Sequence, residues 1–227
     1  MDTLTTIDQS VFFFFNSMHT PFWDAAMALF TQTQLWIVFF LTATFFIIKK
    51  YRAKAVVILF LLALAILISD QFTNLIKDTV KHFRPTHNPA IQDLVYYPLK
   101  KGGLYGFFSA HASNTFTAAT FTSLLFRNTR YSLLVFFWAI LVSYTRIYLG
   151  LHYPSDILTG FIFGILLGYG TYKLLILIEK HFLMLRIPKL LETKLDNKEL
   201  GYIVIVFGVI IVTAMVIIIR LQHYNWI

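Results

Sequence analysis

The sequence has 227 residues, of which 58% are hydrophobic and 13% are charged, and its net charge is +8. Soluble domains carry about a quarter charged residues, so this composition excludes a soluble globular enzyme, a disordered chain and a collagen-like fibre. The sequence contains no cysteine, which excludes disulfides, thiolate zinc sites, iron–sulfur clusters and a cysteine nucleophile. The excess of Lys and Arg favours basic loops at a membrane surface, with no nucleic-acid partner.

The first element in chain order is a short apolar stretch from Thr5 to Asn16, which includes four consecutive phenylalanines. It is too short to cross a bilayer, since a spanning helix needs about 20 mostly apolar residues. The sequence His19-Thr20-Pro21 then interrupts it. We therefore expect a helix that lies in the membrane interface, followed by a turn.

Long apolar segments make up most of the remaining chain. They predict membrane-spanning helices near residues 27–48, 54–77, 110–126, 131–149, 156–178 and 201–221. These segments show no alternation of period two, which favours helices over barrel strands. The predicted fold is an all-α polytopic membrane bundle of about six transmembrane helices with an N-terminal interfacial helix. Its predicted division is a core at 1–180, a cytoplasmic linker at 181–200 and an additional transmembrane helix in 201–227.

Lys and Arg gather in alternate connections between these spans. They occur at Lys49, Lys50, Arg52 and Lys54, at Arg127 and Arg130, and at Lys180, Arg186, Lys189, Lys194 and Lys198. The positive-inside rule makes that side cytoplasmic, so the loops at 78–109 and 150–155 face outside. Short loops and the lack of appended domains suit a bacterial inner membrane with these loops on the periplasmic face.

Three polar clusters, at residues 77–85, 107–111 and 146–156, are not explained by membrane insertion. They lie at the end of the second span, at the start of the third, and between the fourth and fifth. Because the third span crosses before the fourth returns, all three clusters meet at the same membrane face. That face holds three strong cations, two histidines, a serine and an aspartate, without a dense carboxylate set for a metal. Cations at the edge of hydrocarbon are costly, which indicates that they bind an anion, and a dianionic phosphate group fits.

The spacing of His152 and Asp156 indicates a catalytic pair. If a helix begins near Pro154, the aspartate can reach back to the histidine four residues earlier. A carboxylate on one imidazole nitrogen fixes the tautomer and leaves the other nitrogen free to attack phosphorus. His111 can then act as the general acid and base. Ser109 and the amides near Ala110 suit a helix start that binds an anion.

The complete pattern is Lys77, six residues, then Arg84-Pro85; Ser109 with His111; and Arg146, five residues, His152, three residues, Asp156. It resembles the type 2 phosphatidic acid phosphatase family. The resemblance implies a metal-free phosphatase with a phosphohistidine intermediate and no cofactor. It also implies roles for individual residues: phosphate binding by Lys77, Arg84, Arg146 and Ser109, acid–base catalysis by His111, nucleophilic attack by His152, and support of that histidine by Asp156.

Two positions depart from the family pattern. Ala110 stands where the family has glycine, so the anion-binding loop has less access to positive φ. Thr145 replaces the usual serine before Arg146, which is a conservative change. Since every ionisable site residue is present, we expect activity to be retained.

The predicted function is hydrolysis of a lipid phosphomonoester or diphosphate drawn from the bilayer. The candidate substrates are undecaprenyl diphosphate, phosphatidylglycerol phosphate, phosphatidic acid and the phosphate of lipid A. A lipid phosphotransferase with the same site, and a non-catalytic lipid-phosphate binder or transporter, remain as alternatives. Among the other polar and small residues, His82 is interpreted as a packing residue. Asp70 is interpreted either as a structural partner of Lys77 or as a residue that tunes the site. The Gly164–Gly168 pair is interpreted as a site of close helix packing.

Overall fold

The computed structural model describes residues 3–182 and 188–224, and within these ranges the regular structure is helical apart from one isolated bridge between Phe83 and Tyr105. The α-helices are α1 (Thr3–Asn16), α2 (Pro21–Phe30), α3 (Ile37–Tyr51), α4 (Lys54–Val80), α5 (Ala110–Phe126), α6 (Thr129–Tyr148), α7 (Pro154–Phe182) and α8 (Asn197–His223). Short 3-10 turns cover Thr33–Trp36, Pro85–His87 and Gln92–Leu94. The predicted all-α fold is confirmed.

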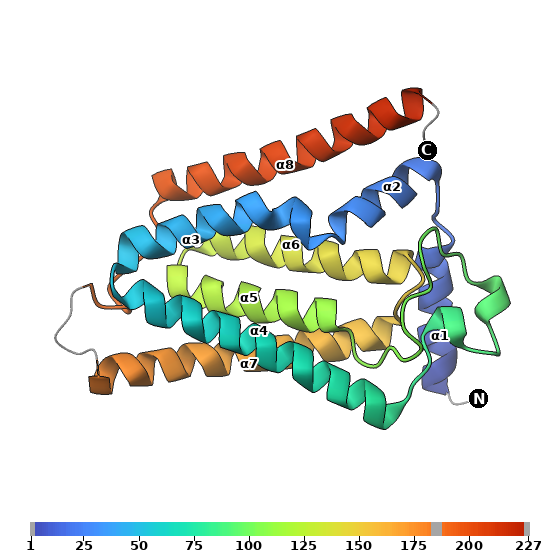
Figure 1. The fold of residues 1–227 in the computed structure, drawn as a ribbon, viewed down its shortest axis with the longest axis horizontal. Coiled ribbons are helices and arrows are strands. Elements are labelled where there is room, and N and C mark those ends of the chain that lie inside the picture. The colour runs from blue at the N-terminus through green and yellow to red at the C-terminus, as the bar shows by residue number, and fades with distance from the viewer. Residues whose placement is uncertain (1–2, 183–187, 225–227) are drawn as a thin grey trace.

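The bundle helices run along the long axis of the molecule, and α1 lies across one end of them (Figure 1). This arrangement agrees with the helix expected in the membrane interface at 5–16. Arg186 and the rest of 183–187, within the predicted linker, and 225–227, within the predicted last segment, lie outside the described residues.

Among the described residues, five helical stretches are long and apolar enough to cross a membrane. They are Thr33–Tyr51, Lys54–Val80, Thr129–Tyr148, Pro154–His181 and Asn197–His223. The remaining predicted span, 110–126, coincides with α5, which has 17 residues and packs against α4, α6 and α7. Most of its side chains are buried by these neighbours. α5 is therefore the central helix of the bundle.

The first predicted span, 27–48, is wrong in its extent, because the chain breaks there into α2, a 3-10 turn and α3. Thr20 caps α2 by accepting a hydrogen bond from the Trp23 amide, and Pro21 occupies its first turn. At the other end, the Trp36 indole N–H donates to the Phe30 carbonyl over 2.9 Å. This bond satisfies a carbonyl that a continuous helix would have paired internally. The membrane stretch accordingly begins at Thr33.

Three glycines of α7, spaced four residues apart, let it lie directly against α5. A Cβ atom built on each would fall within 2.7 Å of a carbonyl oxygen of α5; the pairs are Gly160 with Ser109, Gly164 with Ser113, and Gly168 with Thr117. The close packing predicted for Gly164 and Gly168 is confirmed, and the partner is a helix of the same chain. This contact positions the start of α7 beside the start of α5.

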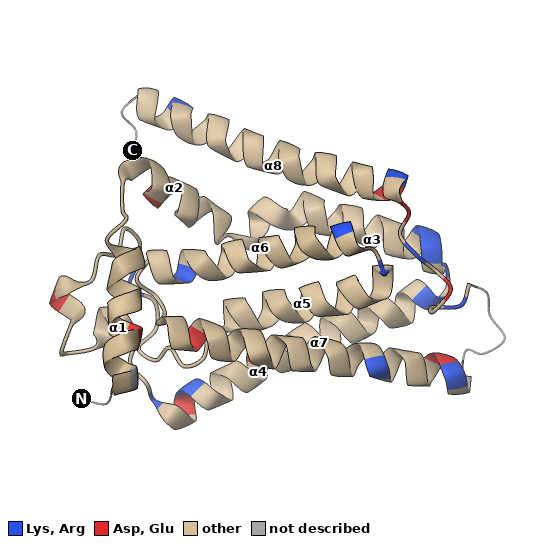
Figure 2. Cartoon of the chain, turned by 180° about the vertical axis from the view of Figure 1, so that it is seen from behind, with Lys and Arg blue, Asp and Glu red and all other residues tan. Residues whose placement is uncertain are grey.

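Lys and Arg residues gather at the end of the bundle opposite α1, around the α3–α4 connection and the start of α8 (Figure 2). Partly buried ion pairs lie at this end: Lys54 Nζ is 2.5 Å from Glu179 Oε1, and Lys50 Nζ is 2.5 Å from Glu199 Oε2. The described part of the predicted linker is attached to the bundle as well, since the Leu195 amide donates to the Phe126 carbonyl. The three polar clusters lie at the other end.

Candidate active site

The eight predicted site residues occupy helix ends and loops at the end of the bundle that α1 crosses (Figure 1). Lys77 is in the last turn of α4, Arg84 in the loop after it, Ser109 at the N-cap of α5, Ala110 and His111 in its first turn, Arg146 in the last turn of α6, His152 just before α7, and Asp156 in its first turn. The sequence predicted that the three polar clusters meet at one membrane face, and the structure agrees by placing them at one end of the bundle.

His152 and Asp156 form a buried pair, with exposed fractions of 2% and 0%. His152 Nδ1 lies 3.1 Å from Asp156 Oδ2, and the same oxygen accepts a hydrogen bond from the Tyr153 amide over 3.0 Å. Pro154 opens α7, so the aspartate at its third position reaches back to the residues before the helix. The helix start thus holds the carboxylate against the imidazole.

The other imidazole nitrogen, His152 Nε2, lies 3.3 Å from Arg84 Nη1. A guanidinium only donates hydrogen bonds, so Nε2 must accept and the proton of the neutral ring resides on Nδ1. This tautomer directs the Nε2 lone pair toward the cation that is predicted to bind phosphate. Arg84 is itself held by the carbonyls of Tyr105 and Leu151, at 3.1 and 3.2 Å.

The surroundings of His152 keep its ring neutral. Burial lowers the pKa of the His152 imidazole well below its ordinary value of 6.5, and the positive charges of Arg84 and Arg146 lower that pKa further. Lys77 and His111 act on His152 in the same direction, so all four side chains lie within electrostatic range of it. A neutral imidazole is the form that can attack phosphorus.

Arg146 reaches the site from α6, and its guanidinium is hydrogen-bonded at the point where α2 ends. Its Nη1 donates to the Thr31 hydroxyl over 2.8 Å, and Thr31 is the residue that ends α2. Its Nε is buried without a hydrogen-bond partner in the described part of the chain. Sequence reasoning missed Thr31, because the hydropathy of 27–48 indicates one uninterrupted helix.

The predicted pairing of Asp70 with Lys77 is indirect. Asn74 lies between them on α4, with its Nδ2 3.4 Å from Asp70 Oδ2 and its Oδ1 3.4 Å from Lys77 Nζ. Asp70 also lines a cavity of about 200 Å³, together with Ala110 and His111.

Ser109 joins the start of α5 to the start of α7. Its hydroxyl accepts a hydrogen bond from the Ala112 amide over 3.4 Å, and its amide donates to the Asp156 carbonyl over 3.1 Å. The first amides of α5 point out of the helix without intrahelical acceptors, as at every helix N-terminus. Such amides favour a bound anion, which fits the predicted role of Ser109 and Ala110.

Gly106 packs against the His152–Asp156 pair, a contact that the sequence alone does not indicate. A Cβ atom at this position would lie 3.0 Å from Arg84 Cγ, 3.1 Å from Asp156 Oδ2 and 3.5 Å from His152 Nδ1. The Gly106 amide donates to the His82 carbonyl over 2.8 Å, which fixes the loop in place. A side chain here would displace the groups it touches.

We expect Gly106→Ala to lower kcat by about tenfold, because the arginine and carboxylate must shift by a few tenths of an ångström. Steady-state phosphate release from a lipid phosphate measures the effect. Gly103→Ala, in the same loop with nothing within 4 Å of its Cβ position, serves as the matched control. Equal activities of the two variants would contradict this description of the loop.

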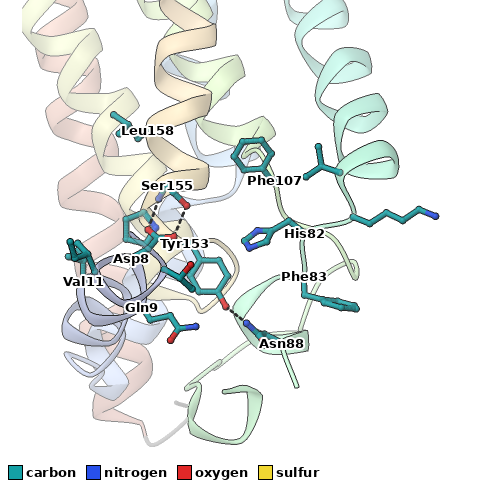
Figure 3. A pocket seen from close by; sticks show the side chains of 15 residues that line it. Asp8, Gln9, Val11, His82, Phe83, Asn88, Phe107, Tyr153, Ser155 and Leu158 are labelled. Carbon is teal, nitrogen blue, oxygen red and sulfur yellow. Dashed lines mark hydrogen bonds between the residues drawn. The ribbon is translucent and has the colours of Figure 1, made fainter. Parts of the chain in front are cut away.

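A cavity of about 900 Å³ lies between α1, the segment after α4 and the start of α7. Figure 3 shows His82 between Phe107 and Tyr153 on its wall. His82 Nδ1 is 3.9 Å from Asp156 Oδ1, an oxygen that has no hydrogen bond within the described residues. Interpretation of His82 as a packing residue missed this proximity; its position between Lys77 and Arg84 in the sequence was the available signal.

The sequence was compared with protein families and with known proteins. The sequence model of the PAP2 superfamily matches residues 54–178. A lipid A 4'-phosphatase of Bacteroides thetaiotaomicron is 38% identical over 177 residues, which cover 76% of this chain and 77% of that protein. A lipid A 4'-phosphatase of Porphyromonas gingivalis is 32% identical over 176 residues, which cover 76% and 75%.

Two solved structures share the fold. LpxE of Aquifex aeolicus superimposes with a TM-score of 0.57 at 25% identity, covering 73% of this chain and 94% of that one. A transmembrane PAP2 type phosphatidylglycerolphosphate phosphatase of Bacillus subtilis gives 0.59 at 18% identity, covering 82% and 90%. The matched segment includes all three polar clusters and more than half of the chain. This integral membrane protein therefore belongs to the PAP2 superfamily.

Proposed function

We propose that this protein is a membrane lipid phosphatase that hydrolyses a lipid phosphomonoester or diphosphate through a phosphohistidine intermediate. The observation that carries the proposal is the buried His152–Asp156 pair, whose free Nε2 faces the Arg84 guanidinium. The relatives named lipid A 4'-phosphatase support the phosphate of lipid A as the first substrate to test. Undecaprenyl diphosphate, phosphatidylglycerol phosphate and phosphatidic acid are the other candidates.

In the proposed reaction, His152 Nε2 attacks phosphorus and the bond from phosphorus to the ester oxygen breaks. His111 donates a proton to the leaving oxygen, and Asp156 stabilises the positive charge that develops on His152. Water then attacks the phosphohistidine, His111 takes a proton from it, and inorganic phosphate leaves. Lys77, Arg84 and Arg146 offset the charge of the phosphoryl oxygens in both steps, together with Ser109 and the first amides of α5.

The site belongs on the outer face of the bilayer in this proposal. The basic connections lie at the end of the bundle opposite the site (Figure 2), and the positive-inside rule assigns basic connections to the cytoplasm. For a bacterial inner membrane, the catalytic face is then periplasmic. A lipid substrate reaches it sideways from the bilayer, with its head group at the bundle end.

We expect the purified protein in detergent to release phosphate from lipid phosphates in the presence of EDTA, because no step of the proposed reaction uses a metal ion. A panel of the four candidate lipids, with and without alcohol or sugar acceptors, measures both rate and selectivity. Transfer of labelled phosphate to an acceptor in preference to water would identify a phosphotransferase. An absolute requirement for added divalent metal would contradict the histidine mechanism.

A further inference from the structure

Asp156 is hydrogen-bonded through only one of its two carboxylate oxygens among the described residues. Its side chain is fully buried at the start of α7. Oδ2 accepts from His152 Nδ1 and from the Tyr153 amide, at 3.1 and 3.0 Å. Oδ1 has no hydrogen bond within the part of the chain that the structure describes. A buried carboxylate oxygen without a donor is costly, so the group that faces Oδ1 bears on how the site works.

His82 faces this oxygen from the loop after α4. Its Nδ1 lies 3.9 Å from Asp156 Oδ1, which is within the range of an ion pair and longer than a hydrogen bond. Catalytic hydrogen bonds are often long in the resting enzyme and shorten as charge develops during the reaction. Asp156 therefore has an imidazole beside each of its oxygens, His152 at Oδ2 and His82 at Oδ1.

The neighbouring loop holds the His82 ring in this position. The Gly106 amide donates to the His82 carbonyl over 2.8 Å. The same glycine packs against Asp156, since a Cβ atom built on it would lie 3.1 Å from Oδ2. The His82 ring lies between Phe107 and Tyr153, with ring centroids 6.3 and 5.4 Å away (Figure 3). The ring is thus placed by backbone pairing and by aromatic contacts on two sides.

We propose that His82 is a positioning residue that holds the Asp156 carboxylate in its orientation against His152; this inference rests on the proposed function. A carboxylate turns easily about its Cβ–Cγ bond, because this torsion has no narrow minima. Donors on both oxygens oppose that turn and stabilise the ionised carboxylate. Asp156 then stays in the orientation that supports the positive charge developing on His152 during attack. His82 acts through Asp156 and is assigned no contact with the substrate.

The role requires the N–H of His82 and no positive charge. Burial lowers the pKa of the His82 imidazole from its ordinary value of 6.5, and the Asp8 carboxylate on α1 acts in the opposite direction. A neutral ring donates from one nitrogen only, and the carboxylate at Oδ1 requires that nitrogen to be Nδ1. An asparagine side chain carries its amide nitrogen the same number of bonds from Cα as histidine Nδ1, so it can supply the same donor.

Three substitutions at position 82 separate the donor from the packing. His82→Asn keeps the donor, His82→Leu has nearly the same shape as His82→Asn without the amide, and His82→Phe keeps a ring without an N–H. We expect His82→Leu and His82→Phe to lower kcat by about tenfold with KM changed by less than about twofold, because the lost interaction acts on the transition state. His82→Asn should stay within about threefold of the unmodified protein.

The measurement is steady-state phosphate release in detergent micelles, from whichever of the four candidate lipids the unmodified protein hydrolyses fastest. The inhibition constant of inorganic phosphate reports binding by the site cations and should be unchanged in every variant. Phe83→Leu is the matched control, since Phe83 is the next residue and lines the same cavity of about 900 Å³ as His82. It should leave both kcat and KM unchanged.

Equal kcat values of His82→Asn and His82→Leu would overturn the inference and leave the proposed function intact. A rise in KM at unchanged kcat would overturn it too, because His82 would then act on substrate binding. Thermal unfolding of each variant accompanies the assay, and His82→Phe replaces His82→Leu in the comparison if the latter does not fold. Failure of both to fold would assign His82 a structural role and overturn the inference. Absence of phosphate release by the unmodified protein from every candidate lipid would overturn the proposed function together with the inference.

Discussion

Replacement of His152 by alanine should abolish phosphate release, with a fall in kcat on the order of 10⁴-fold or more. The reason is that the substitution removes the attacking nitrogen, while the remaining cations can still bind phosphate. A non-catalytic binder or transporter would retain its function in this variant. The measurement is the release of phosphate from a labelled lipid, together with protein-bound label after an alkaline quench that preserves phosphohistidine.

The unmodified protein should carry transient label, and His152→Ala should carry none. His181→Ala is the control, since His181 is an exposed histidine at the far end of α7. Because alanine leaves the buried Asp156 without its histidine partner, thermal unfolding of each variant must accompany the assay. A folded His152→Ala protein with normal turnover would contradict the assignment of the nucleophile.

Substitution of Gly164 by leucine should prevent the bundle from assembling. Its Cβ position lies 2.6 Å from the Ser113 carbonyl oxygen and 3.0 Å from the Thr117 amide, and backbone atoms cannot rotate away as side chains can. α7 must therefore separate from α5 along its length, at a cost of about 3 kcal/mol or more. The yield of monodisperse protein in detergent and its unfolding temperature report the effect.

Gly170→Leu provides a matched comparison on the same helix. Gly170 is exposed and has nothing within 4 Å of its Cβ position, so leucine there only adds an apolar side chain to the outer surface. This variant should retain its yield and gain slightly from the higher helix propensity of leucine. Similar behaviour of the two leucine variants would show that α5 and α7 do not touch as described.

The arrangement of the candidate site is largely predictable from the sequence, because it depends on residues close together in the chain and on the number of membrane crossings. Pro154 opens a helix, and that start alone brings Asp156 back to His152. The number of membrane crossings between the three polar clusters then places them at one membrane face, without any knowledge of how the helices pack. Hydropathy also located α5, although it could not indicate that this helix is enclosed by its neighbours instead of facing lipid.

The contacts that escaped prediction join residues far apart in the chain. Thr31 and Arg146 are 115 positions apart, and an uncharged stretch gave no sign that a helix ends at Thr31. Gly106 offers no side-chain chemistry to interpret, and its closeness to Arg84 and Asp156 arises only when the loop folds over them. Hydropathy describes each segment separately, so it cannot predict contacts between segments that are far apart in the chain.

The bend after α2 has a practical implication for shortened versions of the protein. The superfamily match covers 54–178, which omits both Thr31 and α8, and α8 packs on α2 and α3. An expression fragment trimmed to the match would retain every ionisable group of the site. It would nevertheless remove the Thr31 hydroxyl that anchors the Arg146 guanidinium, and the helix α8 that packs on α2. The smallest fragment that keeps this anchor is thus larger than the segment by which the family is recognised.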